Sequence, residues 1–201
     1  DFYGYTLDVN KNVLIPRRET EELVEYVIKY AKRLNKPAII DVGTGTGAIA
    51  IALSKELNLP VYASDISTKA IEVARKNVEK TGSKVSLLLG DMLKPYIDKN
   101  IKVDILVSNP PYIREDEKIE KIVKDNEPEI ALYAPNNGLF YYEEILKDAK
   151  KVLNDKFLIA FEIGEKQAFD VEKLAHKYLK DVKVEIKKDL SDKNRFVFVY
   201  N

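Results

Sequence analysis

The alternation of strand-like and helix-like segments from residue 37 onward is the feature that most restricts the folds open to this chain. Short apolar runs alternate with longer stretches in which apolar residues recur at helical spacing. The expected strands are 37–42, 60–65, 84–91, 103–109 and 156–163, and the expected helices are 46–57, 67–82, 138–153 and 166–179. Strands joined by helical crossovers run parallel and carry helices on both faces, so the chain is expected to be an α/β protein.

The two ends of the chain depart from this alternation. Residues 2–15 alternate apolar and polar side chains around Asn10-Lys11-Asn12, which predicts a β-hairpin, and residues 17–35 have helical spacing. Residues 182–190 and 195–201 have the pattern of two strands joined by a short polar turn. They predict an antiparallel pair that adds an edge to the sheet.

Composition excludes several function classes. The chain has 201 residues, 45% hydrophobic and 33% charged, which fits one globular domain. Its 33 basic residues balance 33 acidic ones, which argues against a protein that grips nucleic acid through its phosphates. With no cysteine and one histidine, His176 on an expected solvated helix, disulfides and the usual zinc sites are excluded. No secretory signal or apolar run of about 18 residues is present, so we expect a cytoplasmic protein with no membrane contact and no metal.

A glycine-rich loop follows the first expected parallel strand. Gly43, Gly45 and Gly47, with Thr44 and Thr46 between them, lead directly into a helix. Glycine lets a backbone approach a ligand closely, and a helix N-terminus offers free N–H groups. The spacing differs from the dinucleotide-binding pattern and lacks the lysine of a phosphate-binding P-loop. The loop alone is therefore compatible with a ligand site or with a plain tight turn.

Polar residues recur at the carboxyl ends of the following strands. Asp65 ends the second strand, Asp91 and Met92 follow the third, and Asn109 follows the fourth. Each carboxylate could cap a helix or stabilise a turn, but ligands of open α/β sheets bind at this edge, and a carboxylate there can accept both hydroxyls of a ribose. The set as a whole favours a nucleoside-bearing cofactor.

The tetrapeptide Asn109-Pro110-Pro111-Tyr112 is the most specific motif of the chain. The prolines fix the backbone and carry no N–H group, so the loop is stiff and presents the Asn109 side-chain oxygen and the Pro110 carbonyl as acceptors. Two acceptors and the aromatic face of Tyr112 match a planar –NH2 group, as in an amide or a base amine. The same four residues are also compatible with a rigid turn that only ends the strand and binds no ligand.

In combination these segments resemble the PrmC/HemK family of protein-(glutamine-N5) methyltransferases, which are class I S-adenosylmethionine-dependent enzymes. The resemblance covers essentially the whole chain and rests on "VLIPRRETEELV", "DVGTGTGAIA", the Asn-Pro-Pro-Tyr motif, "NEPEIAL", "NNGLFYYEEI", "FEIGEKQ" and "DLSDKNRFVFV". It implies a Rossmann-like, mostly parallel seven-stranded sheet with an antiparallel last strand, helices on both faces and a preceding β-hairpin. It also implies a hairpin extension over residues 1–16 and a methyltransferase domain over 17–201, without the N-terminal helical domain of full-length members.

The resemblance further implies a reaction and a site. The expected substrate is the glutamine in the Gly-Gly-Gln loop of class-1 peptide chain release factors, and the expected cofactor is S-adenosyl-L-methionine, which becomes S-adenosyl-L-homocysteine. The implied cofactor residues are Gly43, Thr44, Gly45, Thr46, Gly47, Asp65, Asp91, Met92 and Asn109, and the implied catalytic and substrate-binding residues are Asn109, Pro110, Pro111 and Tyr112. Arg17, Glu19 and Thr20 are expected to close the site from the N-terminal side, and Glu162 to support its floor or to serve only the strand end.

The chain departs from the family pattern at three places: Arg18 replaces a proline, Ala134-Pro135 replaces a Gly-Gly pair, and Asn136-Asn137 lacks an expected Asp. An adenine-N6 nucleic-acid methyltransferase would use a similar motif, but it needs to flip a base and usually carries a basic recognition region. The sequence is also compatible with methylation of a ribosomal-protein glutamine, or with a domain that only binds cofactor. We expect a monomer whose partner is the release factor, without direct contact to nucleic acid.

Overall fold

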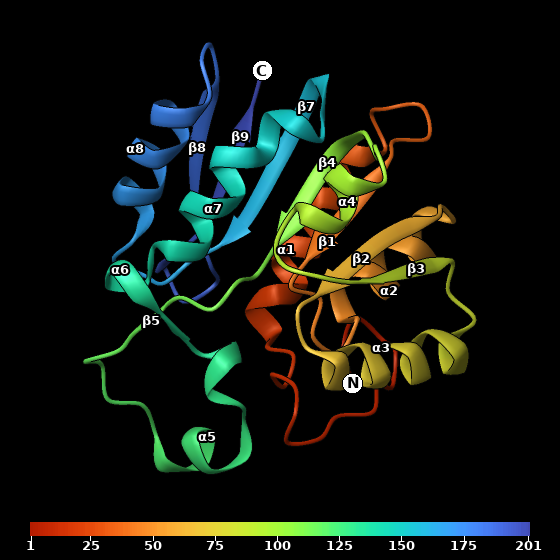
Figure 1. Ribbon diagram of the computed structural model, residues 1–201, viewed down its shortest axis with the longest axis vertical. Helices are drawn as coiled ribbons and strands as arrows, with labels where there is room; N and C mark the ends of the chain where they lie inside the picture. Colours follow the sequence, from red (N-terminus) through yellow and green to blue (C-terminus); the bar gives the residue numbers. More distant parts are fainter.

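A seven-stranded sheet forms the centre of the computed structural model, which describes residues 1–201 (Figure 1). The strand order is β3-β2-β1-β4-β7-β9-β8. The strands are β1 Ile39–Val42, β2 Val61–Asp65, β3 Val85–Leu89, β4 Val103–Ser108, β7 Leu153–Glu162, β8 Lys183–Lys188 and β9 Asn194–Tyr200. The α/β fold and the mostly parallel seven-stranded sheet expected from the sequence are therefore confirmed.

The sheet reverses its direction of growth between β1 and β4. β1 pairs in parallel with β2 on one side and with β4 on the other, so the chain builds β1 to β3 outward and then returns. At such a switch point the loops after the two central strands lead to opposite faces of the sheet and leave a crevice between them. The loops after β1 and β4 carry the glycine-rich segment and the Asn-Pro-Pro-Tyr motif.

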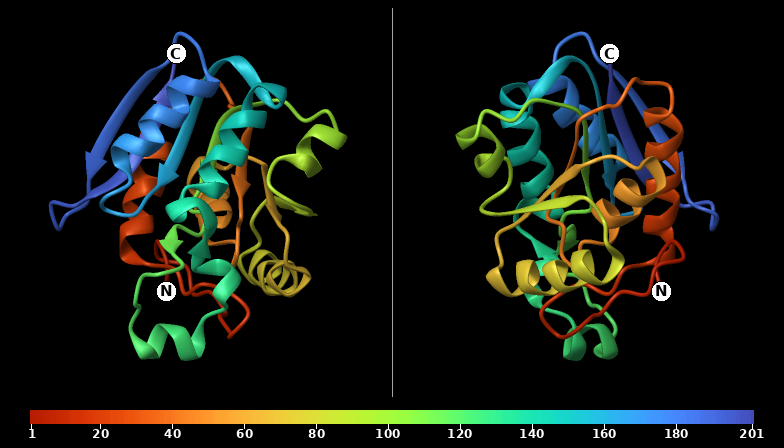
Figure 2. Two further views of the ribbon diagram at one scale, coloured as in Figure 1. Left: turned by 60° about the vertical axis from the view of Figure 1, so that its left-hand side comes forward. Right: turned by 90° about the vertical axis from the view of Figure 1, so that its right-hand side faces the viewer.

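Helices cover both faces of the sheet, as Figure 2 shows. One buried apolar cluster joins α1 and α2 to the sheet, and a second joins α4, α7 and α8 to the opposite face. The helices are α1 Arg18–Ala31, α2 Ala48–Leu57, α3 Thr68–Thr81, α4 Lys94–Asp98, α5 Lys121–Asn126, α6 Pro135–Gly138, α7 Phe140–Asp148 and α8 Ala168–Tyr178, with 3-10 turns η1 Glu129–Ala131 and η2 Ala149–Lys151. The two short strands β5 Ile113–Arg114 and β6 Tyr133–Ala134 pair in parallel beside the main sheet.

Local sequence rules account well for α3. The Ser67 side chain accepts a hydrogen bond from the Ala70 N–H at 3.2 Å, which satisfies one of the free donors of the first turn. At the other end Gly82 has a φ of 60°, in the left-handed region that ends helices. Both residues act at the ends that the sequence predicts.

The C-terminal strands form an antiparallel pair at the edge of the sheet. β9 runs antiparallel to both of its neighbours and lies between β7 and β8, so the last strand of the chain is internal and β8 forms the edge. The residues of β9 from Phe196 to Val199 are buried, whereas β8 alternates exposed and partly buried residues. The expected antiparallel last strand is confirmed, and the C-terminal pair adds an edge to the sheet as predicted, with β8 as the edge strand.

The hairpin expected over residues 2–15 is not formed. The segment contains only an isolated antiparallel bridge between Phe2 and Tyr5 and no paired strands. Its backbone donors bond to side chains of helices instead: Tyr3 N–H donates to Glu21 at 2.7 Å, and Asp8 N–H to Asn77 at 2.7 Å. The alternation of apolar and polar residues is present in this segment, but it reflects packing against α1 and α3 and not the pairing of two strands.

The centre of the sheet should control the stability of the fold. Phe161 in β7 is fully buried and packs edge-on against Tyr142, with ring centroids 5.2 Å apart. We expect Phe161→Ala to lower the free energy of unfolding by about 3–5 kcal/mol, because it leaves a cavity that the sheet cannot close. Urea unfolding measures this change. Phe169→Ala, at a site 65% exposed on α8, is the control and should change it by less than about 0.5 kcal/mol.

Candidate active site

The glycine loop joins β1 to α2 with a backbone that only glycine adopts easily. Gly43, Gly45 and Gly47 have φ values of 74°, 55° and 83°. A Cβ added to Gly43 or Gly45 would meet no atom within 4 Å, whereas one added to Gly47 would lie 3.3 Å from the Ile51 side chain and 3.4 Å from Ala74. The first two glycines therefore leave open space above the loop, and the third allows α2 to pack against α3.

Asp65 fixes this loop from the end of β2. One of its carboxylate oxygens accepts the Gly45 N–H and the other accepts the Ser67 N–H, both at 2.9 Å. Burial raises the pKa of Asp65, and these two N–H groups oppose the rise. Each carboxylate oxygen keeps a second acceptor site, so the group can still accept two hydroxyls from a ligand.

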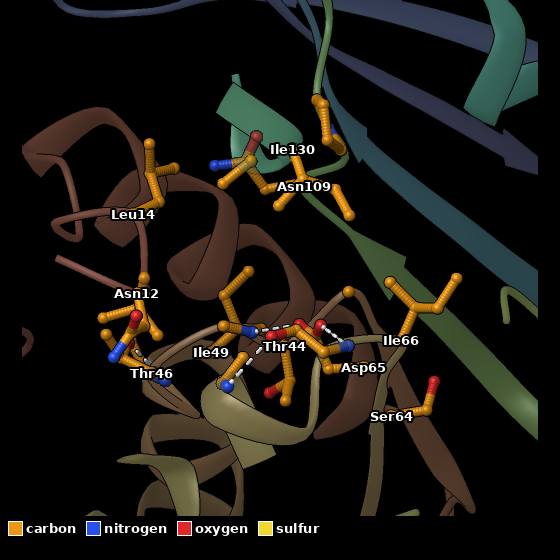
Figure 3. Close-up of a pocket in the computed structure, with 18 of the residues that line it drawn as sticks. Asn12, Leu14, Thr44, Thr46, Ile49, Ser64, Asp65, Ile66, Asn109 and Ile130 are labelled. Atoms are coloured by element: carbon orange, nitrogen blue, oxygen red, sulfur yellow. Dashed lines mark hydrogen bonds between the residues drawn. The ribbon is translucent and has the colours of Figure 1, made fainter. Parts of the chain in front are cut away.

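A pocket of about 920 Å³, counted to its open mouth, extends over the loop (Figure 3). Its lining residues come from the N-terminal segment, the glycine loop, the ends of β2, β3 and β4, the turn η1 and the helices α1, α2, α3 and α7: Asn12, Val13, Leu14, Pro16, Thr20, Gly43, Thr44, Gly45, Thr46, Ala48, Ile49, Ser64, Asp65, Ile66, Ser67, Ala70, Gly90, Met92, Asn109, Pro111, Ile130, Ala131 and Tyr141. The open glycine cradle, the free acceptor sites of Asp65 and the apolar walls fit an adenosine-bearing cofactor.

The structure brings most of the predicted cofactor residues to this pocket. Two of them do not line it: Gly47, where α2 packs against α3, and Asp91, which is exposed although Gly90 before it and Met92 after it line the pocket. Met92 has a φ of 42°, which turns the backbone after the third strand. The role of Asp91 in cofactor binding stays a prediction.

Asn109 stands at the edge of the pocket, at the carboxyl end of β4. Its side-chain Nδ2 donates to the Thr20 hydroxyl at 3.3 Å, and that hydroxyl donates to Glu162 at 2.6 Å. Within the folded protein no N–H or O–H group donates to the Pro110 carbonyl, so it remains an unused acceptor. The two acceptors that the sequence predicts are thus both available for a ligand.

Tyr112 faces a different pocket from Asn109. It lines a polar pocket together with Gln167 and Arg195, and its carbonyl accepts the Gln167 Nε2–H at 2.9 Å. Burial, with the nearby Glu162 carboxylate, raises the pKa of Tyr112 to about 12, so the phenol is neutral. The tetrapeptide therefore contributes to two pockets, with Asn109 and Pro111 on the glycine-loop side and Tyr112 on the other.

The N-terminal segment is held over the pocket by an ion pair that the sequence alone does not reveal. Arg17 donates to one oxygen of Glu127 at 2.5 Å, and the Ile15 N–H donates to the other at 3.1 Å. Glu127 is only 6% exposed. The pair joins the segment that carries Leu14 to the turn that carries Ile130, and both residues line the pocket.

Two apolar contacts of the pocket are also absent from the sequence-based prediction. Ile66 directly follows Asp65 and is 52% exposed although it lines the pocket, and Tyr141 reaches it from α7. An isoleucine next to a carboxylate that is predicted to bind a ligand is a usable signal, whereas nothing local to Tyr141 distinguishes it from the neighbouring aromatic residues.

A buried carboxyl beneath the loop makes stability depend on pH. Asp41 at the end of β1 is fully buried, and burial raises its pKa to about 7, although the Thr44 hydroxyl donates to it at 2.6 Å. The unfolded chain releases this proton near pH 4, so between about pH 4 and 7 the folded state binds more protons, and the stability contributed by the group falls as pH rises.

Replacing this carboxyl tests the sign of the effect. The measured quantity is the free energy of unfolding of Asp41→Asn minus that of the native protein. We expect this difference to become more positive by roughly 2–3 kcal/mol between about pH 5 and pH 8, since each pKa unit corresponds to about 1.4 kcal/mol. Urea unfolding of both proteins at the two pH values measures it. An unchanged difference would show that Asp41 is ionised throughout this range.

The structure contains neither a cluster of metal-binding side chains nor a helix that could span a membrane. No group of three or more His, Cys, Asp or Glu side chains is arranged to hold a metal ion. None of the helices combines the length and the apolar character needed to cross a lipid bilayer.

Comparison with known proteins adds independent findings. The methyltransferase small domain family matches residues 20–171. The chain is 42% identical to the release factor glutamine methyltransferase of Bacillus subtilis over 203 aligned residues, which covers 98% of this chain and 70% of the relative.

Two solved structures show the same fold. The first, a protein-(glutamine-N5) methyltransferase (release factor-specific) from Alicyclobacillus acidocaldarius, has 27% identity and a TM-score of 0.61, with 93% of this chain and 94% of that chain covered. The second, a 16S rRNA N2 G1207 methyltransferase of T. thermophilus in complex with AdoMet and guanosine, has 14% identity and a TM-score of 0.66, with 93% and 44% covered. At that identity the second likeness concerns the fold alone.

Proposed function

The chain belongs to the family of release factor glutamine methyltransferases, and from this premise we propose how its site performs glutamine methylation. The substrate in this proposal is the side-chain amide of the glutamine in the Gly-Gly-Gln loop of a class-1 release factor. The cofactor is S-adenosyl-L-methionine, which when bound supplies an electrophilic methyl group on its sulfonium. The finding that carries the proposal is the position of Asn109, which lines the same pocket as the glycine loop and Asp65.

The cofactor would be held by the residues that line this pocket. Gly43 and Gly45 give its methionine part room above the loop, and the free acceptor sites of Asp65 take the ribose hydroxyls. The exposed side chain of Ile66 offers an apolar surface for the adenine. Thr44 and Thr46 complete the loop, and Asp91 and Met92 are proposed to lie beside the base.

The substrate amide would be held at the Asn-Pro-Pro-Tyr loop. An amide nitrogen is a poor nucleophile because its lone pair is delocalised into the carbonyl. If the Asn109 side-chain oxygen and the Pro110 carbonyl each accept one of its N–H bonds, the nitrogen is fixed in line with the methyl group. Positive charge that develops on it then meets two oriented dipoles.

The methylated amide sheds a proton without a strong base, because an N-protonated amide is highly acidic. Pro111, on the same side as Asn109, is proposed to pack against the side chain of the substrate glutamine and to keep water away. For Tyr112, which lines the neighbouring pocket, stacking on the amide stays a prediction. Catalysis then consists of positioning and of preorganised dipoles, rather than proton transfer by a side chain.

Labelled-methyl transfer tests the substrate class. The protein is incubated with labelled S-adenosylmethionine and, separately, with a release factor, a Gln→Glu variant in its Gly-Gly-Gln loop, adenine-containing DNA and RNA, and ribosomal protein. We expect label only on the native release factor. Label on nucleic acid would instead identify a base amine as the substrate, and label on ribosomal protein a different glutamine.

A further inference from the structure

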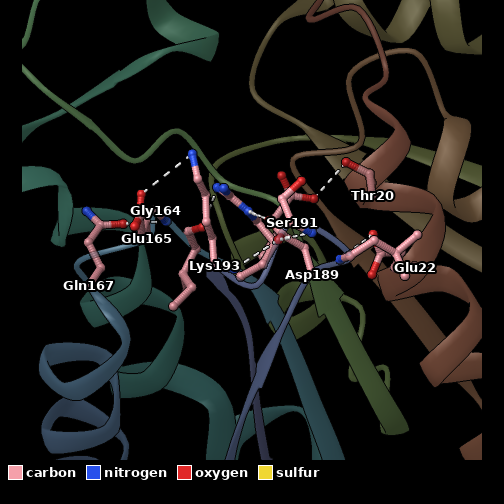
Figure 4. A network of polar contacts seen from close by, with 12 residues as sticks. Thr20, Glu22, Gly164, Glu165, Gln167, Asp189, Ser191 and Lys193 are labelled. Carbon is pink, nitrogen blue, oxygen red and sulfur yellow. Dashed lines mark hydrogen bonds and ion pairs between the residues drawn. The ribbon is translucent and has the colours of Figure 1, made fainter.

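A buried chain of hydrogen bonds lies behind Asn109, and the proposed cofactor and substrate contacts give it no role, although Thr20 lines the pocket. Thr20 on α1 is 4% exposed, and Glu162 at the end of β7 is 2% exposed. The Thr20 hydroxyl donates to Glu162 at 2.6 Å and accepts from Asn109 Nδ2 at 3.3 Å. Figure 4 shows Thr20 directed into this polar network.

The direction of these hydrogen bonds determines which way the Asn109 amide points. A hydroxyl has one proton. With Glu162 ionised, the short bond to the carboxylate uses that proton, so Thr20 can only accept from Asn109. The NH2 end of Asn109 must then face Thr20, and its oxygen must face the opposite way. If Asn109 were flipped, two oxygens without a shared proton would face each other, at a cost similar to that of an unmade buried hydrogen bond.

We propose that Thr20 and the ionised Glu162 carboxylate are positioning residues that fix the amide orientation of Asn109, so that its side-chain oxygen is presented to the nitrogen to be methylated. The inference rests on the proposed function for the identity of that nitrogen. The orientation of the Asn109 amide itself is a property of the chain. It can therefore be tested with or without a substrate.

The surroundings of Glu162 suit this role. Arg195 on β9 lies near but donates to Asp189 at 3.0 Å and to the Ile163 carbonyl at 3.2 Å, so no hydrogen-bonded ion pair occupies the Glu162 carboxylate. Tyr112 from the Asn-Pro-Pro-Tyr loop and Glu19 from α1 also face it.

Burial raises the pKa of Glu162 to about 7, while the Thr20 hydrogen bond and the positive charge of Arg195 oppose the rise. A protonated Glu162 could donate to Thr20, which would free the Thr20 proton for Asn109 and remove the directional constraint. The constraint therefore strengthens as pH rises through about 7.

The simpler role for the pair is a tether that holds α1 against the sheet. The two roles differ in their consequences. A tether supports the fold and contributes nothing to the rotation of the Asn109 side chain, whereas a positioning pair changes that rotation even when the fold is intact.

A nuclear magnetic resonance experiment separates the two roles without any substrate. The side-chain amide of Asn109, assigned by its loss in Asn109→Ala, is followed in the protein saturated with S-adenosylhomocysteine. In the native protein and in Thr20→Ser we expect two well-separated, protected amide protons. In Thr20→Val, which keeps the shape but removes the hydroxyl, we expect both protons to lose their protection from exchange and to shift toward the positions of a free asparagine amide. Native-like signals in Thr20→Val would overturn the proposal.

Kinetics with the release factor provide the second readout. We expect Thr20→Val to lower kcat about 10–100-fold, which is the effect of losing one hydrogen bond in a charged network. The affinity for S-adenosylhomocysteine should change less than about threefold. Thr20→Ser should retain most of the native rate. Thr81→Val, a control at the far end of α3, should have the native kcat. Unchanged kcat in Thr20→Val would contradict the positioning role.

The pH profile tests Glu162 directly. In the native protein kcat should rise as pH increases through about 7, and in Glu162→Gln it should be lower and lose this step. A step that persists in Glu162→Gln would contradict the role of its ionisation. If native protein transfers no methyl group to the release factor while the Asn109 amide stays protected, the proposed function fails and the positioning inference stands.

Discussion

Asn109→Ala is expected to lower kcat for release-factor methylation by about 10²–10³-fold, the loss typical when one oriented hydrogen-bonding group at a reacting centre is removed. The variant loses one of the two acceptors that hold the amide nitrogen, and the remaining Pro110 carbonyl cannot fix its direction alone. Steady-state kinetics with labelled S-adenosylmethionine measure the change. The free energy of unfolding should change little, because Asn109 is only partly buried and its one hydrogen bond is long.

Two controls make the result specific. The affinity for S-adenosylhomocysteine, measured by calorimetry, should change by about tenfold at most in Asn109→Ala, because one hydrogen bond at the pocket edge contributes about 0.5–1.5 kcal/mol. Asn154→Ala removes an exposed asparagine on β7 and should retain full activity. A rate near that of the native protein in Asn109→Ala would remove the basis of the proposed amide site.

Asp65→Ala is expected to weaken S-adenosylhomocysteine binding about 100-fold or more. The carboxylate orients the glycine loop through the Gly45 and Ser67 N–H groups and is proposed to accept the ribose hydroxyls. Hydrogen bonds to a charged group contribute about 1.5–3 kcal/mol each, so losing two of them has a large effect. Calorimetric titration of the protein with S-adenosylhomocysteine measures it.

The matched control is Glu72→Ala, which removes an exposed carboxylate from α3 with the same change in charge. Its affinity should equal that of the native protein at the same salt concentration. Asp91→Ala in the same series tests the remaining predicted carboxylate. Native-like affinity in Asp65→Ala would mean that the cofactor lies elsewhere than over the glycine loop.

The parts of the fold that depend on local rules can be predicted from the sequence. Ser67 and Gly82 act at the ends of their helix, and the spacing of Gly43 to Gly47 sets the turn after β1. Short continuous apolar runs identify the strands of the sheet, because parallel strands are buried on both faces.

The N-terminal segment shows where such rules fail. Apolar alternation in residues 2–15 is the same whether a segment pairs with itself or packs against helices. Only tertiary partners decide between the two. Here Glu21 and Asn77 accept the backbone N–H groups that a second strand would otherwise have bonded.

The sequence predicts the site as a set of strand ends, but it does not predict how these are connected. Thr20 and Glu162 are separated by 142 positions in the sequence and meet at 2.6 Å. Arg17 and Glu127 are 110 positions apart. Long-range pairs of this kind arise from the packing of α1 and the η1 turn around the pocket, and no spacing rule relates them.

The position of the transferred methyl group tests the proposed amide site most directly. After incubation with S-adenosylmethionine, the release factor is digested, and the peptide that contains the Gly-Gly-Gln loop is sequenced by mass spectrometry. We predict one added methyl group on the side-chain nitrogen of that glutamine, absent when Asn109→Ala protein is used. A methyl group on any other residue, or on the same glutamine at an undiminished rate with Asn109→Ala, would contradict the proposed site.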